Sequence, residues 1–314
     1  MTRRIWLASY PKSGNTWLRM LIANLAAQDD RPVGINDLAA TSSIASARGA
    51  FDDLLLIDSG LLTQDEVDCL RPRVYEELAR GAEDDEQDAR QAPPAVRFVK
   101  VHDAYTLTPM GEPLLAGARG ANGAIVVVRD PRDIAPSLAS HRNTSIDDAI
   151  AFMNDRDAVF SANRTKQDPQ LRQKLPSWSG HVTSWLDQTD IPIHLVRYED
   201  LQLDTAAVLR RALEFSGQAA TDEELYRAVR FADFARLKQQ EEEMGFKEAP
   251  QQRGARFFRR GEAGGWRDEL TPDQTARIVA AHGAVMRRLG YDVTPAPLPV
   301  QPDTAGERDR AATH

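Results

Sequence analysis

The chain has 314 residues, 42% of them hydrophobic, which is enough for one large α/β domain or two ordinary ones. Its 39 basic and 47 acidic residues give a net charge of −8, which argues against a general nucleic-acid binder. A site for a polyanion must therefore concentrate its Lys and Arg locally. The single cysteine, Cys69, excludes an internal disulfide. Without a membrane-length apolar run or a signal segment, the sequence predicts a cytoplasmic protein with no membrane partner.

Four apolar runs, separated or followed by helical patterns, predict a parallel sheet with crossover helices. The run Ala124–Val128 is continuously apolar and mostly β-branched, which is typical of a strand buried on both faces. The four predicted strands are Ile5–Ala8, Val96–Val101, Ala124–Val128 and Ile193–Val196.

No sharp change of composition marks a domain boundary, so we expect one α/β domain over residues 1–291, with a central parallel β-sheet flanked by helices. An acidic run followed by Pro93 and Pro94 indicates a solvated insertion at about 80–95. The prolines after Tyr291 predict an extended or disordered tail over 292–314.

Three of the predicted helices carry end signals. Thr221 and Thr271 each precede a helical run and have Glu or Gln three residues later, which is the pattern of a capping box. A third helix, from about Asp204 to Phe215, is expected to end at Gly217.

The segment Ser9–Trp17, SYPKSGNTW, lies between the first strand and an apolar helical run, so it predicts a strand–loop–helix unit. Such a loop leaves unpaired N–H groups at a helix N-terminus, where the helix dipole favours negative charge. Lys12 adds a cation, while Ser13 and Thr16 add hydroxyl donors. The loop differs from the nucleotide-triphosphate loop because Lys12 precedes its only glycine, Gly14. It predicts a site for a phosphate or a similar group, with a plain corner carrying an exposed lysine as the alternative.

The second strand ends in Lys100, Val101 and His102. In open α/β sheets ligands bind at the carboxyl ends of the strands, so His102 is expected on the same rim as Lys12. A histidine there can take a proton from an acceptor hydroxyl. A satisfied structural histidine is the alternative. The spacing of the other histidines indicates no metal site.

The third strand runs into Arg129, Asp130 and Pro131, where Asp130 is a predicted helix N-cap. Arg129 can bind a phosphate with two hydrogen bonds, and Ser137, two turns along the helix, can donate to it. Pro136 removes one backbone hydrogen bond and is expected to kink this helix before Ser137. The alternative for Arg129 is a surface pair with a neighbouring aspartate.

The segment Phe257–Trp266 surrounds two adjacent arginines, Arg259 and Arg260, with glycines. It predicts a flap that closes over an anion, or alternatively an arginine-rich solvated loop.

Together these segments resemble the cytosolic-type family of PAPS-dependent sulfotransferases from Ile5 to about Leu289. PAPS is 3′-phosphoadenosine 5′-phosphosulfate, the sulfuryl donor, and PAP is the bisphosphate that remains after transfer. The resemblance implies the P-loop-like fold that sulfotransferases share with nucleoside triphosphate hydrolases, and a reaction that requires no metal.

The resemblance also implies a role for each matching residue. Lys12 would hold the bridging and sulfuryl oxygens, His102 would be the general base, and Lys100 its auxiliary lysine. The 5′-phosphosulfate would be bound by Ser13, Gly14, Asn15 and Thr16, the adenine by Trp17 and Phe231, and the 3′-phosphate by Arg129, Ser137, Arg259, Arg260 and Gly261, with Tyr198 beside them.

Three positions depart from the family pattern. Asn15 replaces the more common threonine, and Arg260 replaces a lysine without loss of charge. Gly265 replaces an aspartate and is expected to loosen the flap.

We therefore expect sulfuryl transfer from PAPS to a hydroxyl of a small-molecule or glycoside acceptor by in-line displacement. A P-loop small-molecule kinase is one alternative, and it would need a magnesium-binding acid at a strand end, for which Asp130 is the candidate. A non-catalytic module that binds PAP is the other. The oligomeric state is left open, a homodimer included.

The acceptor pocket is expected to be lined by residues 37–58, by the segment around Tyr105 and Leu107, and by residues 142–185. The last stretch contains aromatic and apolar side chains that could equally belong to the core. They are Phe152, Met153, Phe160, Trp178 and Trp185.

Overall fold

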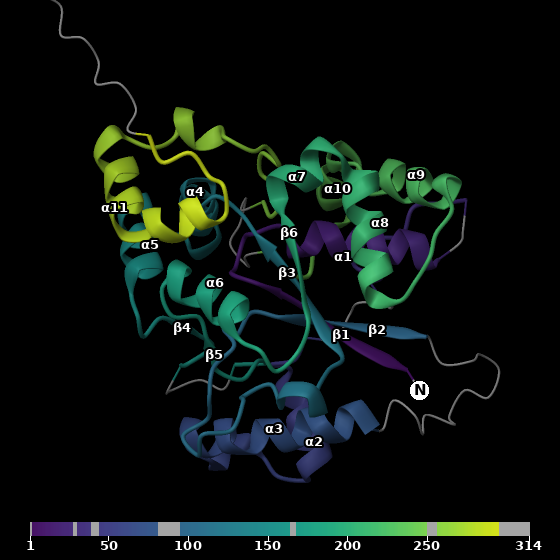
Figure 1. Cartoon of the computed structure of the whole chain (residues 1–314), viewed down its shortest axis with the longest axis vertical. Helices are drawn as coiled ribbons and strands as arrows, with labels where there is room; N and C mark the ends of the chain where they lie inside the picture. The colour runs from purple at the N-terminus through teal and green to yellow at the C-terminus, as the bar shows by residue number, and fades with distance from the viewer. Residues whose placement is uncertain are drawn as a thin grey trace, which may run out of the picture.

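The computed structural model describes residues 2–27, 30–38, 44–80, 95–163, 168–249 and 256–294 (Figure 1). The predicted insertion at about 80–95 and nearly all of the predicted tail over 292–314 lie outside these residues. The elements, in chain order, are β1 (Arg3–Ser9), α1 (Asn15–Ala26), α2 (Arg48–Leu55), α3 (Gln64–Arg80), β2 (Val96–Val101), β3 (Gly123–Val128), α4 (Pro131–Arg142), α5 (Ile146–Asn154), β4 (Val159–Phe160), β5 (Gln173–Lys174), α6 (Trp178–Asp187), β6 (Ile193–Arg197), α7 (Tyr198–Leu203), α8 (Thr205–Ser216), α9 (Asp222–Phe231), α10 (Phe234–Met244) and α11 (Pro272–Arg288).

The four predicted strands pair in parallel in the order β2-β1-β3-β6, which confirms the predicted α/β class. Strand β1 is central: its Leu7 lies beside Lys100 of β2 and beside Ile125 of β3. Because all four strands run the same way, their carboxyl ends meet at one edge of the sheet. The loop after β1, the end of β2 and the end of β3 therefore lie close together.

Alternate residues of each strand face opposite layers of helices. Ile5 and Leu7 of β1 pack into a cluster formed with α1, α7, α8, α9 and α10. Trp6 and Ala8 pack into the other cluster, with α2, α3, α4, α5, α6 and α11. Figure 1 shows the two groups of helices on opposite sides of the sheet. All six residues of β3 are buried, as the continuous apolar run predicts for a strand covered on both faces.

The predicted helix ends are confirmed. Thr221 and Thr271 accept the backbone N–H three residues later and close capping boxes at the starts of α9 and α11. Gly217 ends α8 in the left-handed region, at φ 81°. Asp130 caps α4, which runs unbroken through Pro136 to Arg142.

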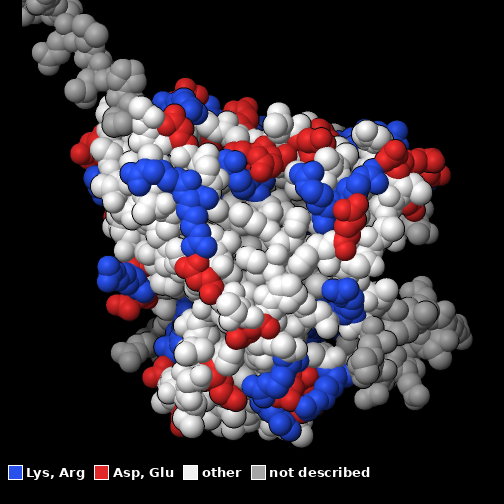
Figure 2. Space-filling view, viewed as in Figure 1, with Lys and Arg blue, Asp and Glu red and all other residues white. Residues whose placement is uncertain are grey.

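Charged side chains of both signs are intermixed around the margins of the face drawn in Figure 2, and its centre is mostly uncharged. No helix in the described part of the chain is long and apolar enough to cross a membrane.

A buried ion pair ties α3 to the end of β2. The Arg71 guanidinium donates to both oxygens of Asp103, at 3.1 and 2.6 Å, and both side chains are almost fully buried. The same carboxylate accepts the backbone N–H of Lys174 in β5. Asp103 follows His102 directly, so this pair also fixes the backbone that carries His102.

We expect Asp103→Ala to lower the free energy of unfolding by about 3 kcal/mol or more, because it leaves the buried Arg71 without its closest carboxylate. Asp65→Ala is the matched control: it removes an exposed partner of Arg172 and should cost much less, because solvent screens a surface pair. Urea unfolding of the two variants measures both values. Equal losses would show that the buried pair contributes no more than a surface pair.

Candidate active site

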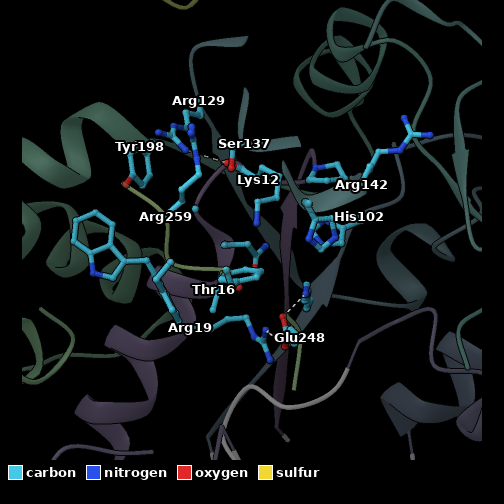
Figure 3. Close-up of a pocket in the computed structure, with 18 of the residues that line it drawn as sticks. Lys12, Thr16, Arg19, His102, Arg129, Ser137, Arg142, Tyr198, Glu248 and Arg259 are labelled. Atoms are coloured by element: carbon cyan, nitrogen blue, oxygen red, sulfur yellow. Dashed lines mark hydrogen bonds and ion pairs between the residues drawn. The ribbon is translucent and has the colours of Figure 1, made fainter. Parts of the chain in front are cut away.

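A cavity of about 590 Å³ opens at the carboxyl edge of the sheet (Figure 3). The loop after β1, the end of β2, the start of α4 and the segment 257–262 all contribute to its lining. Of the fifteen residues predicted for the site, the cavity lining contains all but Ser13 and Phe231. The side chain of Ser13 is buried, and Phe231 is buried at the end of α9.

The loop after β1 is held in a shape that exposes the start of α1. Lys12 and Gly14 lie in the left-handed region, at φ 70° and 102°. A Cβ on Gly14 would lie 2.5 Å from the ring of Tyr198, so both the backbone and the packing require glycine there. Within the described chain, no side chain caps the N-terminus of α1. Its first N–H groups are thus available to an anion.

Asn15 supports the loop from beneath. Its Nδ2 donates to the Leu7 carbonyl at 2.8 Å and to Ser9 Oγ at 3.1 Å, so its amide is used to join the loop to β1. Thr16 lies beside it in the cavity lining. Asn15 thus orders the loop through its side-chain amide. The resemblance implied only that Asn15 binds the 5′-phosphosulfate.

His102 is held in one tautomer. Its Nδ1 lies 2.9 Å from the Ser9 carbonyl oxygen, which can only accept, so Nδ1 carries the proton and Nε2 keeps a lone pair. Burial, followed by the charge of Lys100, lowers the pKa of His102 to about 3, so the ring is neutral. The neutral ring keeps a free lone pair on Nε2, the atom that can accept a proton from a bound hydroxyl.

Lys12 is surrounded by other cations. Burial, together with Lys100 and Arg129, lowers the pKa of its ammonium group to about 7. Its Nζ lies 3.8 Å from the centroid of the Phe257 ring, which supplies a favourable cation–π contact. The low pKa thus reflects first the desolvation of the ammonium group and then the two neighbouring cations, and an anion bound beside Lys12 would raise it.

Arg129 lies at the end of the cavity near Lys12, with its guanidinium 4.3 Å over the ring of Tyr198. It donates to the carbonyls of Lys12, at 3.4 Å, and Glu262, at 2.8 Å. Among the described residues its buried Nε has no hydrogen-bond partner. Ser137 of α4 lines the same end (Figure 3). The unpaired Nε–H of Arg129 and the hydroxyl of Ser137 could both donate to an oxygen of a bound anion.

The glycine-rich segment is anchored to α4. Asp133 accepts the backbone N–H of Gly264 at 2.7 Å and of Trp266 at 2.9 Å, on either side of Gly265. Gly261 lies at φ 67°, and a Cβ there would meet the ring of Phe234 at 2.3 Å. The predicted flap is thus a segment with defined contacts.

Arg259 and Arg260 share one carboxylate, that of Glu269, which accepts from them at 2.8 and 3.0 Å. These contacts lower the pKa of Glu269 although its burial raises it. Both guanidinium groups remain in the cavity lining, so an anion there would compete with Glu269.

Sequence reasoning missed several charged residues of the cavity. Arg19 follows Asn15 by one turn of α1, a spacing that could have identified it. Arg142, at the end of α4, was not missed: it begins the stretch 142–185 expected to line the acceptor pocket, and it lines the cavity with its guanidinium 3.9 Å over the ring of Phe152. Glu248 bridges Arg19 and Lys100, and it lies so far from both in the sequence that no local signal could have placed it.

The expected acceptor wall needs correction. Phe160 and Ile44 line the cavity, but Met153, Trp178 and Trp185 are fully buried in the core. Tyr105 packs on Trp185 and donates to Asp190, so it does not line the cavity. Leu107 is also absent from the lining, and Phe152 is only partly buried against the core. These side chains of α5 and α6 were candidates for the acceptor pocket because they are apolar, but they pack in the core.

In the part of the chain that the structure describes, no group of three or more His, Cys, Asp or Glu side chains is arranged to hold a metal ion.

The chain matches known proteins over nearly its whole length. The sequence profile of the sulfotransferase domain family matches residues 2–290. Cytosolic sulfotransferase 17 of Arabidopsis thaliana is 24% identical over 87% of this chain and 71% of that protein. Cytosolic sulfotransferase 16 of the same plant is 27% identical over 49% of this chain, and the match spans only 47% of that protein. The crystal structure of mouse sulfotransferase SULT7A1 complexed with PAP has a TM-score of 0.56 at 21% identity, over 91% of this chain and 85% of that one.

The chain therefore belongs to the sulfotransferase domain family. Its enzyme class is that of the PAPS-dependent sulfotransferases, EC 2.8.2, in which the sulfuryl group is transferred from PAPS. Small-molecule acceptors are typical of this family.

The low pKa of Lys12 predicts pH-dependent binding of PAP. Above pH 7 the ammonium group is mostly neutral in the empty cavity. A bound anion restores its charge, so binding takes up a proton, and the dissociation constant should rise between pH 7 and 9 by up to about tenfold per unit. Titration calorimetry at several pH values checks this. Lys12→Arg stays charged throughout and should flatten the profile, whereas an unchanged slope in that variant would exclude Lys12 as its origin.

Proposed function

We propose that this chain transfers the sulfuryl group of PAPS to a hydroxyl of a small-molecule or glycoside acceptor by in-line displacement, releasing PAP. One observation carries the proposal. The cavity places a cation-rich wall with an open helix N-terminus beside a neutral histidine whose Nε2 is the proton acceptor. The first feature suits a polyanionic donor, and the second suits activation of a hydroxyl.

Two groups of cavity residues would bind the two charged ends of PAPS. Arg129, Ser137, Arg259 and Arg260 would bind the 3′-phosphate, and Tyr198 would lie beside it. The orphaned Nε of Arg129 supports this assignment. Lys12, Gly14 and Thr16 would hold the 5′-phosphosulfate against the start of α1. Trp17 would contact the adenine: it lies edge-on to Tyr198 and is fixed by its Nε1 donating to the Ala232 carbonyl.

Phe231 precedes the carbonyl that Trp17 uses, so the predicted pair of base-contacting aromatic residues lies close together in the fold. Its ring is buried beneath Arg230, 5.0 Å from that guanidinium. For Phe231 to stack on adenine, its ring would have to become exposed when the donor binds.

His102 would begin the reaction by taking the proton of the acceptor hydroxyl at Nε2. The acceptor oxygen then forms a bond to sulfur as the bond from sulfur to the 5′-phosphate oxygen breaks. Lys12 would neutralise the charge that builds on the leaving oxygen, a preorganised electrostatic effect. Negative groups near Lys12 and Lys100 would also raise the pKa of His102, because they offset the cationic charge that lowers it.

The kinase alternative has less support. Asp130, its candidate magnesium ligand, accepts from the backbone N–H and the guanidinium of Arg132 and caps α4. A catalytically active His102 would separate the enzyme from the non-catalytic alternative.

Binding of PAP tests the donor assignment. PAP at about one hundred times its dissociation constant should stabilise the chain by about 2.7 kcal/mol, a rise of several degrees in Tm, without added metal. Arg129→Ala should lose most of this shift. Arg73→Ala, which removes an exposed arginine of α3, should retain it. A shift produced by ATP with magnesium and not by PAP would favour a kinase.

Turnover tests the catalytic assignments. Lys12→Ala should lower turnover by about a hundred- to a thousand-fold, because it removes a donor to the developing charge. His102→Ala should abolish turnover yet retain the PAP-dependent rise in Tm. If His102→Ala lost PAP binding and turnover together, His102 would be a structural residue, and near-normal turnover of Lys12→Ala would contradict the role of Lys12.

A further inference from the structure

Glu248 occupies a small anion site within the cavity. Its Oε1 lies 2.6 Å from Arg19 Nη1, and its Oε2 lies 2.8 Å from Lys100 Nζ. The two cationic side chains are largely buried, at 2% and 12% exposure, whereas that of Glu248 is 29% exposed. Although burial raises the pKa of Glu248, the two cations lower it to about 2, so the carboxylate is charged. Two buried cations, Arg19 and Lys100, thus hold the carboxylate of Glu248, the most exposed of the three side chains.

This anion site lies beside the proposed base. Lys100 is the last but one residue of β2, and His102 follows directly after the strand. Both line the cavity, and the charges of Lys100 and Glu248 both act on His102. In Figure 3, Glu248 and Arg19 lie at the opposite end of the cavity from Arg129 and Ser137. The anion site is therefore on the acceptor side, away from the proposed 3′-phosphate site.

The Glu248 carboxylate can leave Arg19 and Lys100 without a movement of its backbone. The neighbouring Phe246 is buried and packs 4.9 Å from the ring of Phe257. The backbone N–H of Lys247 donates to Asn36 at 2.9 Å. These contacts anchor the segment, so only side-chain rotation is needed to move the Glu248 carboxylate into solvent.

The charge balance favours exchange of one anion for another. Removal of Glu248 without replacement would leave Arg19 and Lys100 as buried cations without their shared carboxylate, which is unfavourable. A substrate carboxylate would restore both ion pairs and release Glu248 to water. A cationic acceptor is disfavoured because both Glu248 oxygens already bind cations, and the group of three keeps a net positive charge.

We propose that Arg19 and Lys100 form an acceptor-binding anion subsite, and that the chain sulfates hydroxyl compounds that also carry a carboxylate. Glu248 occupies this subsite until such an acceptor displaces it. The inference rests on the proposed function, since it names the acceptor class for the same cavity. Arg19 and Glu248 become specificity-determining residues.

The test uses two acceptors that share a phenol and differ in charge, 4-hydroxybenzoate and its amide 4-hydroxybenzamide. Binding to the PAP-loaded chain is measured by calorimetry, and turnover with PAPS is measured in parallel. The wild-type chain should prefer the carboxylate in both assays. Arg19→Gln should reduce this preference about ten- to a hundred-fold, as expected for loss of a charged hydrogen bond. Glu248→Gln should increase it, because the internal competitor is removed.

Glu243→Gln is the matched control, since it removes one carboxylate from exposed α10 outside the cavity lining and should leave the preference unchanged. The PAP-dependent rise in Tm shows for every variant that the donor end is intact. Equal binding of the two compounds by PAP-loaded wild-type chain would overturn the inference and leave the proposed function standing. A preference that Glu248→Gln decreases would also overturn it. Absence of any PAP-dependent shift in the wild-type chain would overturn the proposed function itself.

Discussion

The parallel pairing of β1 with β2 and β3 is the constraint on which the site depends. It brings three carboxyl ends to one edge, so that Lys12 in the loop after β1, His102 directly after β2 and Arg129 directly after β3 reach the same cavity. Chain segments more than a hundred residues apart thereby form one site. The helices that bury the two faces of the sheet hold this edge in place, and the Arg71–Asp103 pair fixes the strand end that carries the histidine.

A second constraint is electrostatic. The chain has a net charge of −8, yet its cavity gathers cations from several segments that are far apart in the sequence. Internal carboxylates balance part of this charge: Glu269 pairs with Arg259 and Arg260, and Glu248 with Arg19 and Lys100. Burial lowers the pKa of Lys12, and the neighbouring Lys100 and Arg129 lower it further. Anionic ligands would therefore replace carboxylates that are already in place, which limits the desolvation penalty of holding so many cations together.

Much of the fold was predictable because its signals are local. The four strands were visible as apolar runs, and the starts of α9 and α11 as capping boxes. Helix α7 was missed because it directly follows β6 and its N-cap residue, Arg197, makes no side-chain cap. The aromatic residues of α5 and α6 could not be assigned, since an apolar side chain looks the same in sequence whether it lines a cavity or covers a sheet. Trp178 and Trp185 do the latter.

The sequence by itself determined the class of fold and the place of the loop after β1, because the hydrophobic period, the capping residues and the loop residues Lys12, Ser13, Gly14 and Thr16 are each read from adjacent positions. It also identified Lys100, His102 and Arg129 by their places at strand ends. Only the tertiary structure decided the tautomer of His102, the pairing of Glu248 with Arg19 and Lys100, and the burial of Phe231. The physical reason is range: these properties depend on contacts between residues far apart in the chain, and such contacts leave no pattern in neighbouring residues.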